Sequence, residues 1–215
     1  MTAADFSIYI VDDDAGVLKA LSRLLRTVGY HVRTFNSPEV FLEQHDPTVP
    51  GCAIFDVAMP GLDGLQLQSA LMAGGIERPV IFITGKGDIP TSVRAMKAGA
   101  VDFLTKPVSA EALLEAIERA RRLDAQARQN RDVTASIEAR LATLTPRERE
   151  VFTYVVAGRL NKQIAGDLGT VEKTIKVHRG RMMSKLGVRT VQDLVRLAER
   201  AGIRPHAAAG RPGDA

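Results

Sequence analysis

The sequence has one cysteine and no long apolar run, and these absences narrow the kinds of protein that it can encode. Cys52 is the single cysteine among 215 residues, so an internal disulfide framework is excluded and a cysteine zinc site cannot be built from it. No apolar run approaches the roughly 18 to 20 residues that a membrane span requires. The opening residues, Met1 to Ser7, lack the basic region and apolar stretch of a signal peptide. We therefore expect a cytoplasmic protein with no membrane partner, in which Cys52 is a buried strand residue.

The composition is that of a globular protein whose two halves differ in charge. Hydrophobic residues make up 45% and charged residues 25%, which excludes a disordered or fibrous chain, and the length favours two domains. Residues 1–122 carry 12 Lys and Arg against 15 Asp and Glu, whereas residues 123–215 carry 17 against 10. This asymmetry indicates that the second half meets a polyanion, although a basic solvated surface would give the same count.

The first half alternates short β-rich runs with stretches of helical spacing. Five such units predict an α/β fold, a doubly wound five-stranded parallel sheet with helices on both faces. The predicted strands are residues 7–11, 31–35, 52–55, 80–84 and 101–104, and the predicted helices are 17–28, 38–44, 65–71, 90–98 and 109 onward.

Polar residues follow the predicted strands at their carboxyl ends, where open parallel sheets place their functional sites. The first strand is followed by Asp12, Asp13 and Asp14, and the later strand ends carry Asp56, Thr84 and Lys106. Carboxylates held close together repel one another, and a hard divalent cation such as Mg²⁺ (or Mn²⁺) removes that conflict. We expect Asp13 and Asp56 to be direct ligands, Asp12 to act through water, and Asp14 to cap the following helix.

Four motifs, each at a strand end, together resemble a response-regulator receiver domain with the flavodoxin-like fold. They are Ile10 to Asp14, Phe55 to Gly61, Thr84 to Asp88 and Gly99 to Pro107. The resemblance covers residues 7–120. It implies that Asp56 accepts a phosphoryl group from a sensor histidine kinase, and that Asp12, Asp13, Asp56 and the backbone carbonyl of Ala58 hold the metal. It also implies that Lys106 and Thr84 bind the phosphoryl oxygens, and that Phe103 swings inward when Thr84 moves.

A turnover enzyme is the main competing interpretation of this half. Phosphatases of the haloacid dehalogenase type also form an aspartyl phosphate, but they carry a second Asp two residues later, where this chain has Ala58. The chain also lacks a Walker P-loop, HExxH and GxSxG. We therefore expect no enzyme activity beyond self-phosphorylation and slow self-dephosphorylation at Asp56.

A polar stretch of helical pattern joins the two halves. Seven of its positions repeat at alternating spacings of four and three, which would place them along one side of a helix as the seam of a coiled coil. The heptad pattern is weak, because some of these positions are polar. These positions are Leu123, Ala127, Asn130, Thr134, Ile137, Leu141 and Leu144. The stretch is either a linker helix that self-associates or an extended spacer.

The last part of the chain is predicted to be basic and all-helical. Thr145 and Glu148 form a capping box around Pro146, and further helices are expected at residues 162–168, 171–186 and 191–201. In the helix at 171–186 the apolar stripe of Val171, Ile175, Met182 and Leu186, edged by His178, should pack on the domain. The opposite face is basic with small residues, including Gly180, which suits close approach to a DNA major groove or to another helix.

Residues 144–201 resemble a LuxR-type, or GerE-type, helix-turn-helix DNA-binding domain. The segments that carry the resemblance are Leu144 to Val151, Asn161 to Ala165 and Glu172 to Arg179. By this resemblance Lys173, Lys176 and Val177 face bases, while Thr174, Arg179 and Arg181 contact phosphates. The two domains together resemble the FixJ branch of response regulators.

The predicted organisation is a receiver at 1–122, a helical linker at 123–143, a helix-turn-helix domain at 144–204 and a disordered tail at 205–215. The resemblance implies that phosphorylation of Asp56 drives formation of a homodimer, binding to promoter DNA and recruitment of RNA polymerase, which activates transcription. Two alternatives stay open at this point. One is a receiver whose helical domain docks on a protein, and the other is an aspartyl-phosphate hydrolase.

Overall fold

The computed structural model describes residues 6–85, 87 and 89–203, which form two compact units divided at Arg128 and Gln129. The predicted tail at 205–215 lies outside the described residues, as do Met1 to Asp5 and two motif residues, Lys86 and Asp88. The division falls inside the predicted linker, and the domain boundaries proposed from the sequence stay predictions.

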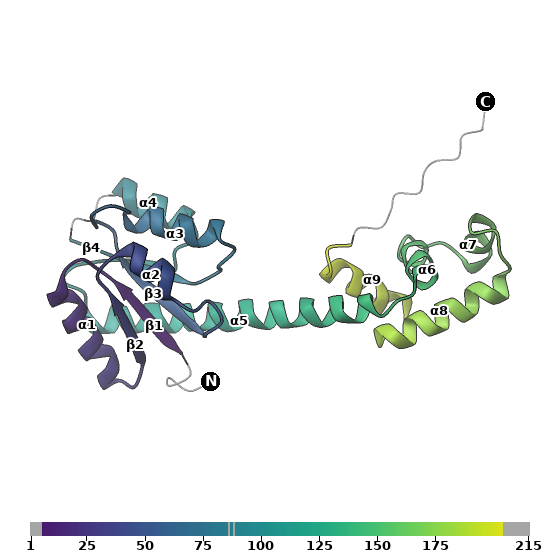
Figure 1. The fold of residues 1–215 in the computed structure, drawn as a ribbon, viewed down its shortest axis with the longest axis horizontal. Helices are drawn as coiled ribbons and strands as arrows, with labels where there is room; N and C mark the ends of the chain where they lie inside the picture. The colour runs from purple at the N-terminus through teal and green to yellow at the C-terminus, as the bar shows by residue number, and fades with distance from the viewer. Residues whose placement is uncertain (1–5, 86, 88, 204–215) are drawn as a thin grey trace, which may run out of the picture. The chain divides into compact units, whose positions relative to one another are not determined.

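The N-terminal unit is a five-stranded parallel sheet in the order β2-β1-β3-β4-β5 (Figure 1). The strands are β1 (Ser7–Val11), β2 (His31–Phe35), β3 (Gly51–Asp56), β4 (Val80–Thr84) and β5 (Asp102–Thr105). The helices are α1 (Ala15–Thr27), α2 (Pro38–Gln44), α3 (Gly64–Ala73), α4 (Ile89–Lys97) and α5 (Ala110–Ala142). The predicted doubly wound fold is confirmed.

Helices cover both faces of this sheet. On one face α1 and α5 contribute Leu25 and Ile117 to a buried cluster with Ile10 of β1. On the other face α2 and α3 contribute Phe41 and Leu67 to a second cluster, in which α4 also takes part. Because β1, β3 and β4 are buried on both sides, their sequences are almost continuously apolar. Cys52 lies in β3 as predicted, and burial raises the pKa of its thiol to about 12.

The C-terminal unit is helical. It contains the end of α5 together with α6 (Pro146–Val156), α7 (Asn161–Asp167), α8 (Glu172–Leu186) and α9 (Val191–Arg200). The capping box predicted at the start of α6 is present, with Thr145 and Glu148 satisfying each other's backbone N–H groups. The last three positions of the predicted heptad seam, Ile137, Leu141 and Leu144, are buried in this unit's own core.

No helix in the described part of the chain is long and apolar enough to cross a membrane.

Candidate functional site

The carboxyl ends of β1 and β3 bring three carboxylates together. Asp12 directly follows β1 and is fully buried, Asp56 is the last residue of β3 and is 4% exposed, and Asp13 is exposed. One oxygen from each carboxylate lies within 4.8 Å of the others. β1 and β3 are neighbours in the sheet although β2 lies between them in sequence, so this is the point where the strand order reverses.

Lys106 supplies the positive charge of this cluster. Its Nζ donates a hydrogen bond to Asp12 Oδ2 at 2.7 Å and lies 3.1 Å from Asp56 Oδ1, close enough for an ion pair. The backbone holds the lysine in place, since its N–H donates to the Thr84 carbonyl at 2.7 Å. Burial disfavours the charged ammonium, but pairing with Asp12 and Asp56 outweighs this effect and raises the pKa of Lys106.

Burial raises the pKa of Asp56 above its usual value. Lys106 opposes the shift, while the charges of Asp12 and Asp13 add to it. A nearby cation therefore favours the charged form of Asp56, which burial and the two neighbouring carboxylates disfavour.

Asp14 has a different role from the two residues before it. Its Oδ1 accepts hydrogen bonds from the Gly16 N–H at 2.7 Å and the Val17 N–H at 3.3 Å, which makes it the N-cap of α1. The expectation that Asp14 caps a helix is confirmed, and the cluster consists of Asp12, Asp13 and Asp56.

Thr84 and Phe103 lie on the same face of the sheet. Phe103 pairs with Phe82, and Thr84 pairs with Thr105, so the two residues are diagonal neighbours on adjacent strands. Thr84 is buried at the end of β4, whereas Phe103 is half-buried and its ring centroid lies 6.4 Å from that of Phe82. A rearrangement of Thr84 would therefore change the space next to Phe103.

The loop after β3 holds its backbone close to Asp56. Ala58 is exposed two residues beyond Asp56, and Gly64, at the start of α3, packs directly against the Asp56 carbonyl. A Cβ on Gly64 would lie only 2.3 Å from that oxygen, so glycine is required for this approach.

The donor set fits a hard divalent cation. The three clustered groups are all oxygen ligands, which Mg²⁺ and Mn²⁺ prefer, and the Ala58 carbonyl follows two residues after Asp56. Lys106 alone cannot neutralise three carboxylates, which leaves net negative charge for a cation to balance.

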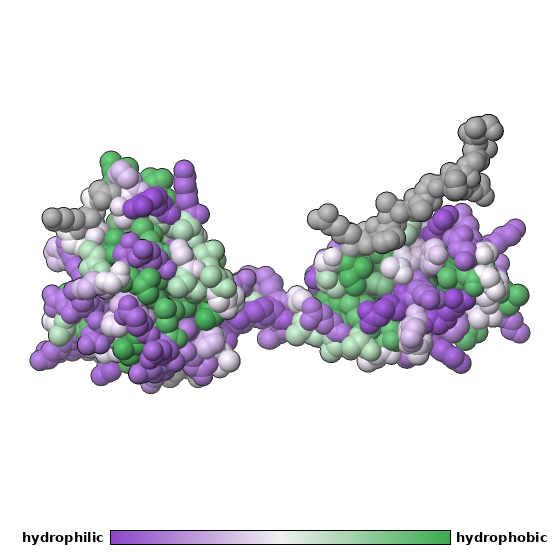
Figure 2. Space-filling model, turned by 45° about the horizontal axis from the view of Figure 1, so that its top comes forward, coloured by the Kyte–Doolittle hydropathy of each residue, from purple (hydrophilic) through white to green (hydrophobic). Residues whose placement is uncertain are grey.

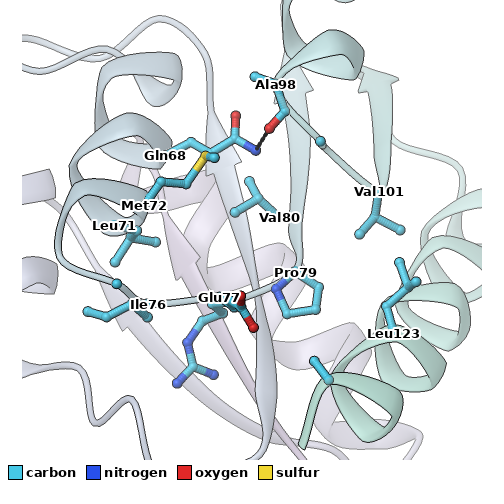
Figure 3. A pocket seen from close by; sticks show the side chains of 14 residues that line it. Gln68, Leu71, Met72, Ile76, Glu77, Pro79, Val80, Ala98, Val101 and Leu123 are labelled. Atoms are coloured by element: carbon cyan, nitrogen blue, oxygen red, sulfur yellow. Dashed lines mark hydrogen bonds between the residues drawn. The ribbon is translucent and has the colours of Figure 1, made fainter. Parts of the chain in front are cut away.

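A groove of about 480 Å³ lies elsewhere on this unit, between α3, the start of β4 and α5 (Figure 3). Its lining is mainly apolar and includes Leu71, Val80 and Leu123. None of the clustered carboxylates contributes to it, so the groove is separate from the site at the strand ends.

In the C-terminal unit, α8 presents a basic face. Lys173, Lys176, Val177 and Arg181 are exposed, and Thr174 and Arg179 are half-buried at the edge of this face. Residues spaced by three and four along a helix share one side, so the exposed set forms a continuous stripe that includes Gly180 and Ser184. Figure 2 shows hydrophilic side chains interspersed with apolar ones over the visible face of this unit.

Two basic residues of α8 also have partners inside the fold. The Arg179 Nη1 donates to Asn161 Oδ1 of α7 at 2.9 Å. The Lys185 Nζ donates to Glu148 Oε2 of α6 at 2.6 Å and to the Thr143 carbonyl at 3.1 Å. These pairs were not predicted, because nothing local in the sequence indicates which side chains of separate helices meet.

The prediction that an apolar stripe of α8 packs on the core is wrong at its first residue, Val171. Ile175, Met182 and Leu186 are buried, but Val171 is 65% exposed. Val171 is the N-cap of α8 and has an extended backbone, so the helical spacing counted from it does not apply. Gly180 is open to solvent, and a Cβ there would meet no described atom within 4 Å. No described helix of this chain therefore requires a glycine at that position.

Comparison with known proteins supports the family resemblance of both halves of the chain. The model of the response regulator receiver domain matches residues 8–118, and that of the bacterial regulatory proteins of the luxR family matches residues 142–198. The response regulator protein TodT of Pseudomonas putida F1 is 47% identical over 193 residues, which cover 90% of this chain and 85% of TodT. The transcriptional regulatory protein FixJ of Bradyrhizobium diazoefficiens is 41% identical, with 91% and 96% covered.

Solved structures of response regulators have the same fold. The solved structure of the response regulator StyR is 46% identical and superposes with a TM-score of 0.79, covering 92% of this chain and all of that one. Full-length FixJ from B. japonicum superposes with a TM-score of 0.56 at 40% identity, with 94% and 99% covered.

Proposed function

This chain belongs to the two-component response regulators that join a receiver domain to a LuxR-family DNA-binding domain, and from that membership we propose that phosphorylation of Asp56 controls its binding to promoter DNA. The observation that carries the proposal is the cluster of Asp12, Asp13 and Asp56 at the strand ends, where Lys106 pairs with Asp12 and Asp56.

Asp56 is the nucleophile of the proposed phosphoryl transfer. One of its carboxylate oxygens attacks the phosphorus of a phosphohistidine on a sensor histidine kinase. The new P–O bond replaces the P–N bond, and the electron pair returns to the histidine nitrogen. Water later cleaves the aspartyl phosphate, which returns the carboxylate and releases inorganic phosphate. The chain acts only on itself in this scheme, as is usual for a regulator rather than a classical enzyme.

A divalent cation, Mg²⁺ or Mn²⁺, held by Asp12, Asp13, Asp56 and the Ala58 carbonyl would offset the negative charge that gathers on the transferring group. Lys106 already lies 3.1 Å from Asp56 Oδ1 and is placed to bind a phosphoryl oxygen. The Thr84 hydroxyl would donate a hydrogen bond to a second phosphoryl oxygen.

The proposed switch starts at Thr84. When its side chain moves toward the phosphoryl group, Phe103 turns into the space beside it, as the diagonal register of β4 and β5 allows. This movement would repack the face made by α4, β5 and α5, on which two receivers would form a homodimer. Exposed apolar side chains of α4, Ile89, Val93 and Met96, support this choice of face.

Two C-terminal units would then bind adjacent half-sites. Lys173, Lys176 and Val177 would face bases, and Thr174, Arg179 and Arg181 would contact phosphates. Joining two modules raises the effective concentration of the second by a large factor without new contacts. We further propose that the bound dimer recruits RNA polymerase and activates transcription.

Two linked experiments test this function. Incubation with an acyl phosphate and Mg²⁺ should add one phosphoryl group to the intact mass of the wild type, and none to Asp56→Asn. Selection from a random duplex library with the beryllofluoride mimic should then enrich one recurring sequence. Selection of no duplex by either form would contradict the DNA-binding half, and an Asp56→Asn protein that still gains the phosphoryl group would contradict the choice of acceptor.

A further inference from the structure

A second group of charged side chains lies at the amino ends of the strands, the opposite edge of the sheet from the carboxylate site. Asp124 of α5 is 2% exposed, although its neighbour Leu123 is 53% exposed and projects toward Val101 in Figure 3. Between Ala120 and Ile137, a stretch that is described throughout, Asp124 is the one buried residue. Figure 2 shows the exposed part of this helix as mainly hydrophilic.

A buried carboxylate loses its hydration, which is unfavourable unless the charge is paired. The partner of Asp124 is Arg128, one turn later, whose Nε donates to Asp124 Oδ2 at 2.8 Å. The other end of the same guanidinium reaches a distant segment, because Arg128 Nη1 donates to the Thr48 carbonyl at 2.6 Å. Arg128 therefore links α5 to the loop between α2 and β3.

That loop is itself held in one conformation. Asp46 Oδ1 accepts hydrogen bonds from both the N–H and the hydroxyl of Thr48, at 2.8 Å and 2.6 Å. Arg78, before β4, donates to the carbonyls of Asp46 and Val49 at 2.8 Å and 3.3 Å. The Thr48 carbonyl is thus a fixed acceptor rather than a mobile one.

Arg78 adds a second buried positive charge that acts on Asp124. Its guanidinium is buried over the ring of Tyr9, with 4.4 Å from the central carbon to the ring centroid. Its Nε and Nη1 have no hydrogen-bond partner in the part of the chain that the structure describes. Burial lowers the pKa of Arg78, and the charge of Asp124 acts in the opposite direction. Each buried charge therefore makes the other less costly.

We propose that Asp124 and Arg128 are positioning residues that fix the last receiver turn of α5 to the Thr48 loop and so couple the receiver to the linker. Beyond Ala120 the helix has no apolar residue buried in the receiver core, and Leu123 and Ala127 only line the groove, so the pair of Asp124 and Arg128, here called the latch, is the buried contact that holds it there. Without the latch the helix after Ala120 would no longer be fixed to the receiver, and a change in the receiver would not reach the linker as a defined displacement. The inference rests on the proposed phosphorylation-dependent binding of DNA.

The test compares full-length wild type, Arg128→Ala, Arg128→Lys and the control Arg131→Ala. Arg131 is an exposed arginine on the same helix, so its loss removes the same charge without touching Asp124 or Thr48. Lysine keeps the charge but has one nitrogen and cannot bond Asp124 and Thr48 as the two ends of a guanidinium do. The readouts are the ratio of duplex affinities with and without beryllofluoride and Mg²⁺, and hydrogen exchange of residues 121–134.

We expect the affinity ratio to fall at least about tenfold in Arg128→Ala and Arg128→Lys. Linking two binding modules can raise affinity by about 10²- to 10⁴-fold, so a loss of this size is within reach. The unstimulated affinity and the uptake of a phosphoryl group should stay within about twofold of wild type, and exchange at 121–134 should rise. Arg131→Ala should match wild type in every readout. If Arg128→Ala keeps the wild-type affinity ratio, the proposed role of the latch is wrong but the proposed function stands. If the mimic does not change the affinity of the wild type, both the proposed function and the coupling are wrong.

Discussion

Asp12, Asp13 and Asp14 are consecutive, yet each carboxylate has a different environment. Asp12 is buried and accepts a hydrogen bond from Lys106, Asp13 is exposed beside it, and Asp14 caps α1. The difference follows from the connection between β1, which ends at Val11, and α1, which begins at Ala15. Asp14 stands at the N-cap of the helix, whereas Asp12 and Asp13 stay at the strand end. Substitution of Asp13 should therefore affect the metal site and substitution of Asp14 the helix cap. Asp12 contacts both, because its Oδ1 accepts a hydrogen bond from the Asp14 N–H at 2.9 Å.

We predict that Asp13→Asn weakens Mg²⁺ binding about tenfold, because affinity for a hard cation follows the number of charged oxygen ligands. Asp14→Ala should leave Mg²⁺ affinity unchanged and lower the free energy of unfolding by about 1 kcal/mol, the usual cost of a lost N-cap. Isothermal titration with Mg²⁺ measures the first quantity, and hydrogen-exchange protection of the receiver amides measures the second. Equal Mg²⁺ affinities in Asp13→Asn and wild type would remove Asp13 from the ligand set.

Glu148 is a residue whose protonation should affect the C-terminal unit. It is buried, and the hydrogen bond from Lys185, helped by the Thr145 N–H, lowers the pKa of its carboxyl. Because the folded-state pKa lies below the unfolded one, the carboxylate stabilises the unit above the unfolded pKa, and this contribution is lost as pH falls through the folded pKa.

Glu148→Gln should therefore reduce the stability of this unit by about 1–2 kcal/mol at pH 7, with little difference from wild type at low pH. Hydrogen-exchange protection of the α6 and α8 amides at the two pH values reports this directly, since a protein of two units need not unfold in one step. A loss of protection that is the same at both pH values would show that the charge of Glu148 is not the cause.

At the scale of elements, α8 combines a packed face with an exposed one. Ile175, Met182 and Leu186 anchor the helix, and the exposed stripe with Gly180 stands opposite. A glycine inside a helix costs up to about 1 kcal/mol relative to alanine. Since no described atom lies within 4 Å of a Cβ at Gly180, the fold itself does not need it.

Gly180→Ala should raise the free energy of unfolding of the C-terminal unit by about 0.5–1 kcal/mol and weaken duplex binding at the same time. The opposite signs arise because the methyl group favours the helix but occupies space that a close DNA backbone would use. Hydrogen-exchange protection of the α8 amides and duplex titration on the same preparation give both values. A more stable variant with unchanged DNA affinity would mean that Gly180 does not face DNA.

The elements that the sequence predicted well are those with local signals. Thr145, Pro146 and Glu148 define the start of α6 by themselves, and apolar runs define β1 and β4. Val171 was misplaced because helical spacing was counted from a residue outside the helix. Asp124 could not be identified as buried, because its burial depends on Thr48 and Arg78, which are distant in sequence. Pairs such as Lys185 with Glu148 were missed for the same reason.

At the scale of the whole molecule, the charge asymmetry has a measurable consequence. The described receiver site concentrates carboxylates, and the exposed stripe of α8 concentrates cations. Binding of a cationic surface to duplex DNA releases counterions, so the affinity should fall steeply with salt.

We predict that Arg181→Ala weakens binding to all duplexes alike and reduces the slope of log affinity against log salt by about one, as loss of a phosphate contact does. Lys176→Ala should instead reduce discrimination between the selected duplex and a mutated one. Arg200→Ala removes a charge from the exposed end of α9 and is the control, with slope and discrimination unchanged. If all three variants changed the slope equally, net charge rather than the α8 stripe would be responsible.

The most direct test of the account is the affinity of the full-length protein for one selected duplex, measured with and without beryllofluoride and Mg²⁺, in wild type and in Asp56→Asn. The account predicts that the mimic strengthens wild-type binding at least about tenfold, as expected when two linked modules bind together, and leaves Asp56→Asn unchanged. An unresponsive wild type, or an Asp56→Asn protein that responds equally, would contradict control of DNA binding by phosphorylation of Asp56.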